Sequence, residues 1–99
     1  MNRIDLIRTD EARVAMINLA PNEISPQHLH SEVVEYVVCL SGCIEVHELD
    51  EIARVTKLVP GQVHEIGSRV IHHLINGSAT DSEYLLIQNG MYDFVPINS

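Results

Sequence analysis

The chain has 99 residues, and its 14 Asp and Glu residues outnumber its 6 Lys and Arg residues to give a formal net charge of −8. This length suits one domain, so we expect residues 1–99 to form a single domain. The acidic balance excludes a nucleic-acid partner, and no apolar run approaches the roughly 20 residues that span a membrane. Because no uninterrupted apolar stretch of a signal peptide is present either, we expect a soluble, cytoplasmic protein.

Most segments of the chain alternate with a period of two, which predicts strands, and the first of these strands is expected over residues 12–20. Residues 12–20 carry apolar side chains on both faces, as in a strand buried on both sides or lying at a subunit interface. An alternative interpretation makes residues 4–17 a helix with Thr9 or Asp10 as its N-cap. Two prolines then bracket an irregular connection over 21–26.

The middle of the chain contains two apolar runs around a Ser-Gly turn. Residues 33–40 are rich in β-branched side chains, and residues 43–49 continue the pattern, so we predict a hairpin. Cys39 and Cys43 flank the turn. We expect them to be two small buried side chains, with a cross-strand disulfide as the alternative.

Four further segments continue the alternation towards the C-terminus. We expect strands over 53–58, 62–66, 69–75 and 83–88, with turn-forming residues between them. Short strands at near-regular spacing predict an all-β sandwich or barrel with little or no helix. The tail from Asn89 is weakly patterned, as in a segment that packs across a neighbour.

Six histidines are present, and the chemistry centres on two of them. His28 and His30 project from the same face of an extended segment, where both imidazoles can reach a metal ion at about 2.0–2.1 Å. Glu35 begins the next apolar run, and its odd offset from His30 requires a bend near residues 31–32 if its carboxylate is to join them. A fourth ligand must come from elsewhere, and His64 and His72 are the candidates.

This pattern resembles the cupin family, whose first motif reads G(X)5HXH(X)3-4E(X)6G. Residues of about 22–42 match its spacing, and the motif positions are held by Asn22 at the leading glycine and by His28, His30, Glu35 and Gly42. The second motif reads G(X)5PXG(X)2H(X)3N and corresponds to about 61–76. Its positions are held by Gly61, by Gly67 in place of proline, by Arg69 in place of the second glycine, and by His72 and Asn76.

The resemblance implies a double-stranded β-helix, also called a jelly roll or cupin barrel, with one divalent transition metal ion inside. The implied metal ligands are His28, His30, Glu35 and His72, a set that suits Fe, Mn, Ni, Cu or Zn. His64 is the alternative fourth ligand, because PGQVH also fits the family's G-x-x-H. If it is not a ligand, His64 is expected to line the cavity as an acid–base group. Cupins are commonly homodimers.

The function implied is that of a metal-binding cupin, and we expect a metal-dependent enzyme acting on a small-molecule substrate. The resemblance favours a non-haem dioxygenase-type oxidoreductase. The alternatives are a metal-assisted isomerase, lyase or cyclase, a non-catalytic protein that binds a metal or metabolite, and a subunit whose metal serves only structure. Strand alternation turns His47 and His73 away from the site, so we expect neither to bind the metal.

Overall fold

A computed structural model describes residues 1–98, and these residues form strands, turns and loops without a helix. The strands are β1 (Asn2–Arg8), β2 (Ala12–Leu19), β3 (His28–Leu29), β4 (Val34–Ser41), β5 (Ile44–Leu49), β6 (Ala53–Leu58), β7 (Val63–Ile66), β8 (Ile71–Asn76), β9 (Ser82–Asn89) and β10 (Val95–Pro96). The described residues therefore also lack a helix long and apolar enough to cross a membrane.

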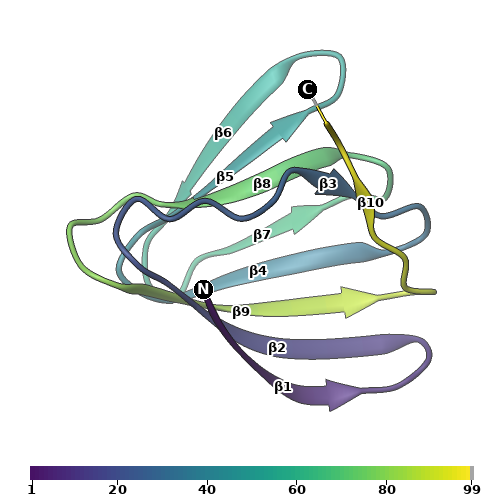
Figure 1. Cartoon of the computed structure of the whole chain (residues 1–99), viewed down its shortest axis with the longest axis horizontal. Coiled ribbons are helices and arrows are strands. Elements are labelled where there is room, and N and C mark those ends of the chain that lie inside the picture. The colour runs from purple at the N-terminus through teal and green to yellow at the C-terminus, as the bar shows by residue number, and fades with distance from the viewer. Residues whose placement is uncertain (99) are drawn as a thin grey trace.

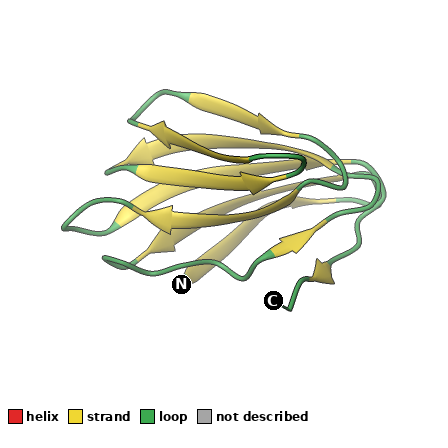
Figure 2. Ribbon diagram, turned by 90° about the horizontal axis from the view of Figure 1, so that it is seen from above, coloured by secondary structure: helices red, strands yellow, loops and turns green. Residues whose placement is uncertain are grey.

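The strands form two antiparallel sheets that face each other (Figures 1 and 2). One sheet has the order β1-β2-β9-β4-β7, and the other has the order β10-β3-β8-β5-β6. Strands that are distant in sequence, such as β2 and β9, lie side by side, while several strands adjacent in sequence lie in opposite sheets. This arrangement confirms the predicted all-β jelly roll.

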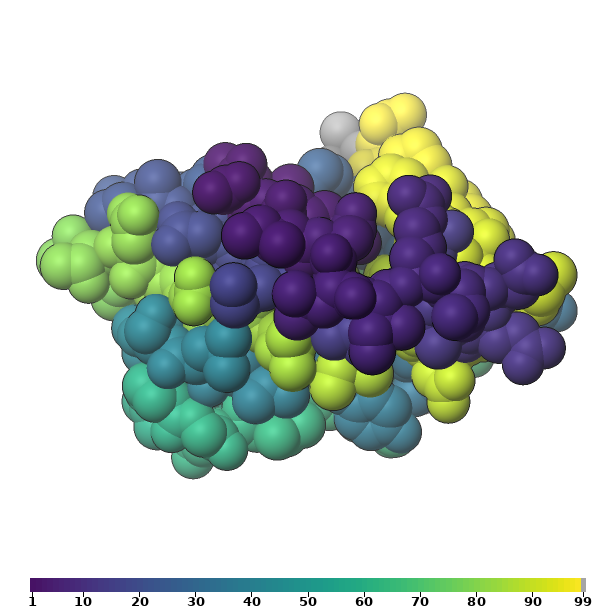
Figure 3. Space-filling view, turned by 90° about the horizontal axis from the view of Figure 1, so that it is seen from below, coloured from purple at the N-terminus to yellow at the C-terminus, as the bar shows by residue number. Residues whose placement is uncertain are grey.

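The N-terminal residues form two paired strands, so the alternative of a helix over 4–17 is wrong. Ala15, Ile17 and Leu19 of β2 are buried between the sheets, whereas the opposite face of β2 is only half-buried. β1 was not predicted as a strand, and every one of its residues is exposed. Figure 3 shows the N-terminal residues as an outer ridge on the face of the molecule seen there.

The predicted hairpin between residues 33–40 and 43–49 is wrong. β4 pairs with β7 and β9, whereas β5 pairs with β6 and β8, so the Ser-Gly turn carries the chain from one sheet to the other. A Cβ at Gly42 would clash with the Ser82 hydroxyl, which explains why this crossing needs glycine. Cys39 and Cys43 are both free thiols, and Cys39 is fully buried.

The inner side chains are arranged in layers along the strands. Val37 on β4, Leu74 on β8 and Leu86 on β9 form part of an apolar layer, and burying each such side chain stabilises the fold by about 1.5–3 kcal/mol. Two residues along from these, the same inner face presents polar side chains that belong to one end of the barrel. They are Glu35, His72 and Gln88.

Two residues at glycine positions of the family motifs have a left-handed backbone. Asn22 and Arg69 both have a φ of 64°, and Gly42 and Gly61 also have positive φ. Asparagine tolerates this region better than most residues, whereas arginine is strained there. The turns therefore keep the conformation that the motif glycines would adopt, and Arg69 donates its backbone N–H to the His30 carbonyl at 2.7 Å.

Candidate metal centre

Four side chains that the sequence singled out lie together between the two sheets. His28 on β3 is directly opposite His72 on β8, and Glu35 reaches the same point from β4 in the facing sheet. His30 follows β3, and the chain then bends at residues 31–32, as the offset of Glu35 required. One ligand atom from each of the four lies within 4.8 Å of the others, so the group could hold a metal ion.

Backbone carbonyl groups fix the orientation of all three imidazoles. The Nδ1–H of His28 donates to the Pro26 carbonyl at 2.7 Å, that of His72 donates to the Val70 carbonyl at 2.8 Å, and that of His30 donates to the Asp93 carbonyl. Because a carbonyl oxygen only accepts, each Nδ1 must carry the hydrogen. In the neutral ring the Nε2 lone pair is then free to bind a cation.

Three of the ligand atoms are buried and lack a hydrogen-bond partner. The Nε2 atoms of His30 and His72 each lie 2.9 Å from Oε1 of Glu35, but none of the three atoms makes a hydrogen bond with acceptable geometry. Unpaired polar atoms buried this completely are costly and call for a partner. Their convergence on one point is the arrangement that a divalent cation would satisfy, so the residues fit a metal ion.

Burial and mutual contact shift the pKa values of three of these four groups. Burial alone would raise the pKa of Glu35, but the imidazoles of His30 and His72 outweigh it and lower that pKa to about 2. Burial lowers the pKa of His28, which favours its neutral form. Burial also opposes the charged form of His30, but contact with Glu35 overcomes this and raises its pKa. The carboxylate is therefore charged at neutral pH.

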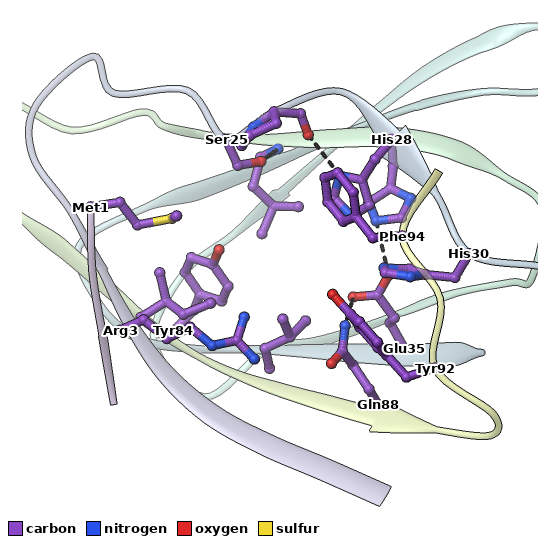
Figure 4. Close-up of a pocket in the computed structure, with 15 residues that line it drawn as sticks. Met1, Arg3, Ser25, His28, His30, Glu35, Tyr84, Gln88, Tyr92 and Phe94 are labelled. Carbon is purple, nitrogen blue, oxygen red and sulfur yellow. Dashed lines mark hydrogen bonds and ion pairs between the residues drawn. The ribbon is translucent and has the colours of Figure 1, made fainter. Parts of the chain in front are cut away.

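A cavity of about 140 Å³ opens beside the four side chains (Figure 4). Part of its wall comes from the weakly patterned C-terminal tail, which the sequence did not connect to the site. The Phe94 ring stacks on the His28 ring with 4.6 Å between their centroids, and the centroid of the Tyr92 ring lies 5.4 Å from that of His30. The Arg13 guanidinium lies over the Tyr92 ring, with its Cζ 3.8 Å from the ring centroid. The tail thus packs across the site rather than away from it.

Gln88 is another residue that sequence reasoning missed. It faces Glu35 across the pairing of β4 and β9, and its Nε2 donates to Oε2 of Glu35 at 3.4 Å. Since a carboxylate only accepts, the amide nitrogen must be on this side, and Oε1 of Gln88 is left buried without a partner. The alternation of β9 could have found it, because Gln88 shares the inner face with Leu86 and Tyr84.

His64 lies outside this group. It shares the inner side of β7 with Ile66, as predicted, but its Nε2 contacts Oε1 of the buried Glu48 at 2.6 Å. It does not line the cavity, so its predicted place in the cavity wall is wrong, and its acid–base role stays a prediction. The reason is its strand: β7 is at the sheet edge next to β4, where His64 reaches β5 of the facing sheet instead.

The remaining two histidines lie on the outer face of the second sheet, as the alternation predicted. His47 and His73 are direct neighbours across β5 and β8, and their rings stack with centroids 4.8 Å apart. Burial lowers the pKa of His73, and the nearby charges of His47 and His72 add to this effect. His73 is adjacent in sequence to His72 but points away from the cluster, which makes it a matched control for the site.

Comparison with known proteins identifies the family. Residues 15–88 match the family model described as the Cupin domain, a stretch that includes all four clustered residues. The chain belongs to the cupin family. No curated protein sequence matches it.

Solved structures share the fold of this cupin at low sequence identity. One is an uncharacterised conserved protein with a double-stranded β-helix domain from Klebsiella pneumoniae, with a TM-score of 0.85 and 18% identity. The match covers 99% of this chain and 84% of the Klebsiella chain. The TT1209 protein of Thermus thermophilus has a TM-score of 0.82 and 19% identity, and the match covers 91% of this chain and 83% of the TT1209 chain. An oxalate oxidase has a TM-score of 0.80 and 18% identity.

The oxalate oxidase is the larger protein. The match covers 88% of this cupin but only 46% of the oxalate oxidase chain, so this cupin spans about half of that enzyme's length. At these identities the similarity shows a common double-stranded β-helix.

Proposed function

We propose that this cupin is a metal-dependent enzyme that acts on a small molecule, with His28, His30, Glu35 and His72 as the ligands of one divalent transition metal ion. The observation that carries the proposal is the set of buried ligand atoms without hydrogen-bond partners, which converge on one point beside a cavity. A purely structural metal is usually enclosed by protein, whereas this four-ligand group borders a cavity that a substrate can enter.

The donor set limits which ions fit. Three imidazoles and one carboxylate suit Fe, Mn, Ni, Cu or Zn, and ligand type alone does not choose among them. When bound, such an ion supplies a Lewis acid or a redox centre for a small-molecule substrate.

The chain's own residues prepare the site. The carbonyl groups of Pro26, Val70 and Asp93 hold each imidazole in one tautomer, and Gln88 orients the Glu35 carboxylate. The rings of Tyr92 and Phe94 cover the histidines and reduce the access of water.

A dioxygenase-type oxidoreductase is the favoured activity. Its support is the open cavity at the metal ligands together with the similarity in fold to oxalate oxidase, a protein named for a redox reaction. A metal-assisted isomerase, lyase or cyclase would use the same site without oxygen. The two classes of enzyme therefore differ in whether they consume oxygen, which can be measured.

Oxygen uptake separates these activities. The protein is stripped with a chelator, reloaded with Fe(II), Mn(II), Ni(II), Cu(II) or Zn(II), and presented with a panel of small organic acids and carbonyl compounds. The dioxygenase proposal predicts substrate-dependent oxygen consumption that a chelator abolishes. Metal-dependent turnover without oxygen uptake identifies the isomerase, lyase or cyclase class. Metal binding without any turnover on the panel would count for a non-catalytic binding protein.

We further propose that the protein acts as a cytoplasmic homodimer. Exposed apolar side chains on β1, namely Ile4, Leu6 and Ile7, support a contact between copies. Light scattering at micromolar concentration is expected to give twice the mass of the chain, and the mass of one chain would contradict this.

A further inference from the structure

The cavity has a second polar end, away from the metal ligands. Arg3 on β1 and Tyr84 on β9 both line it. Figure 4 shows the Arg3 guanidinium and the Tyr84 ring on the side of the cavity away from His28, His30 and Glu35. Between the two ends the lining is apolar and includes Ile17, Leu74 and Leu86. Neither Arg3 nor Tyr84 is used by the proposed metal site.

Strand pairing explains why an arginine from an exposed edge strand reaches this space. Arg3 pairs with Ile17 of β2, and Ile17 pairs in turn with Tyr84 of β9. Directly paired residues project from the same face of a sheet, and Ile17 is buried between the sheets. Arg3 and Tyr84 therefore flank Ile17 on the inner face, where their polar ends can approach one molecule.

Both groups have hydrogen-bonding capacity to spare. The Nε of Arg3 donates to Oδ1 of Asp5 at 3.0 Å, which leaves the Nη groups at the end of the guanidinium for another acceptor. Tyr84 is only 3% exposed, and its hydroxyl makes none of the hydrogen bonds found among the described residues. Burial raises the pKa of Tyr84, so the hydroxyl keeps its proton and acts as a donor. The Nη groups of Arg3 and the hydroxyl of Tyr84 thus line one small cavity without an acceptor among the described residues.

The charge around the cavity favours an anion. Arg3 is the only lysine or arginine among the described residues that line it, in a chain with a formal net charge of −8. A divalent ion held by the single carboxylate of Glu35 would retain positive charge at one end of the cavity, and at the other end the charge of Arg3 is partly offset by its ion pair with the exposed Asp5. A carboxylate accepts from an arginine and a tyrosine hydroxyl together through charge-assisted hydrogen bonds.

The size of the cavity limits the molecule. An engineered cavity of about 150 Å³ in another protein holds benzene, so a volume near 140 Å³ suits about six to eight non-hydrogen atoms. Along β9 the Tyr84 and Gln88 positions are four residues apart, or roughly 13 Å, and their side chains reduce the free span between the two ends. A short chain with one end at each polar group fits this space.

We propose that Arg3 and Tyr84 form a carboxylate-binding subsite, and that the substrate is a small carboxylic acid whose carboxylate lies there while its other end faces the metal. This inference rests on the proposed function only in naming the ligand a substrate. The carboxylate is bound by the protein at the end of the cavity opposite to the metal ligands. Apolar contacts with Ile17, Leu74 and Leu86 hold the middle of the molecule.

Calorimetric titration with pentanoate and with its neutral amide, pentanamide, tests the subsite. Both probes have seven non-hydrogen atoms and differ in charge at one end. They are titrated into zinc-loaded and metal-free protein, as the wild type and as the variants Arg3→Gln, Tyr84→Phe and Arg8→Gln. Arg8→Gln is the matched control, because Arg8 is on the same strand and does not line this cavity. Metal content and thermal unfolding are measured for every variant.

Pentanoate is expected to bind the wild type at least tenfold more tightly than pentanamide. Arg3→Gln should weaken pentanoate binding about tenfold to a hundredfold, as for a lost charge-assisted hydrogen bond, and Tyr84→Phe should weaken it about tenfold. Neither variant should lose metal, and Arg8→Gln should bind pentanoate like the wild type. Equal affinity for the amide, or unchanged binding in Arg3→Gln, would overturn the subsite.

Comparing the zinc-loaded protein with the metal-free protein separates this inference from the proposed function. Arg3-dependent binding of pentanoate to a protein that takes up no metal would support the subsite and count against the metal-dependent enzyme. Binding that requires zinc but is insensitive to Arg3→Gln would place the carboxylate on the metal and overturn the subsite alone.

Discussion

Replacing His30 with alanine should abolish the thermal stabilisation that a divalent metal ion gives to this cupin. His30 is 2% exposed, and its Nε2 is one of the buried ligand atoms that lack a hydrogen-bond partner. An ion that binds only the folded state, at a free concentration 100 times its Kd, adds about 2.7 kcal/mol of stability. For a domain of this size, each kcal/mol raises Tm by roughly 4–8 °C, so the wild type should gain about 10–20 °C.

Differential scanning fluorimetry of chelator-stripped protein measures this shift, with Ni(II) or Mn(II) added to the same free concentration for every variant. His30→Ala is expected to gain less than about a quarter of the wild-type shift, because the stabilisation that a bound ion gives falls as its affinity for the folded state falls. His73→Ala is the control, since its ring stacks on His47 on the outer face and it should gain as much as the wild type. A full metal-induced shift in His30→Ala would refute the assignment.

Three further substitutions test the electrostatics and the backbone. The pKa of Glu35 falls from the ordinary 4.5 to about 2 in the metal-free fold, so its charge contributes stability above pH 4.5 that is lost as the pH falls towards 2. Between pH 5 and pH 2.5 the wild type should lose about 2 kcal/mol of its free energy of unfolding through Glu35, measured by urea unfolding. Glu35→Gln should lack most of this loss, and an unchanged loss would contradict the assignment. Arg69→Gly should raise the free energy of unfolding by about 0.5–1 kcal/mol, because φ is 64° there; a decrease would show that the arginine is not strained. Gly90→Ala should lower it by about 1–3 kcal/mol, since φ is 127° and a Cβ would clash with the Glu32 carbonyl oxygen; a neutral result in the same assay would argue against that contact.

The local spacing of the ligands could be predicted from sequence because it depends on short-range geometry. His28 and His30 differ by one strand period, and the bend that brings Glu35 back was required by its odd offset. The order of the strands could not be predicted in the same way. The Ser-Gly turn at Gly42 has the composition of a hairpin turn, but burial of β4 and β5 against different partners takes the chain across to the other sheet.

The parts of the site that depend on long-range packing were not predicted. Asp93 orients His30 from 63 residues away, and Phe94 covers His28, although the tail has no strong pattern. His64 was placed on the correct side of its strand, but only the pairing of the sheets shows that Glu48 takes it out of the cavity. The period-two alternation of the sequence thus identified the inward-facing side chains, while the arrangement of the strands in the two sheets decided which of them meet.

Elemental analysis of protein purified without added metal is the most direct test of the proposed metal centre. The wild type and His73→Ala are expected to hold about one divalent transition metal ion per chain, while Glu35→Ala should lose most of it, because the buried carboxylate is the one anionic ligand of the described cluster. Full occupancy in Glu35→Ala would remove Glu35 from the site. A wild type that takes up no ion, even after incubation with all five candidate metals, would contradict the proposed metal centre.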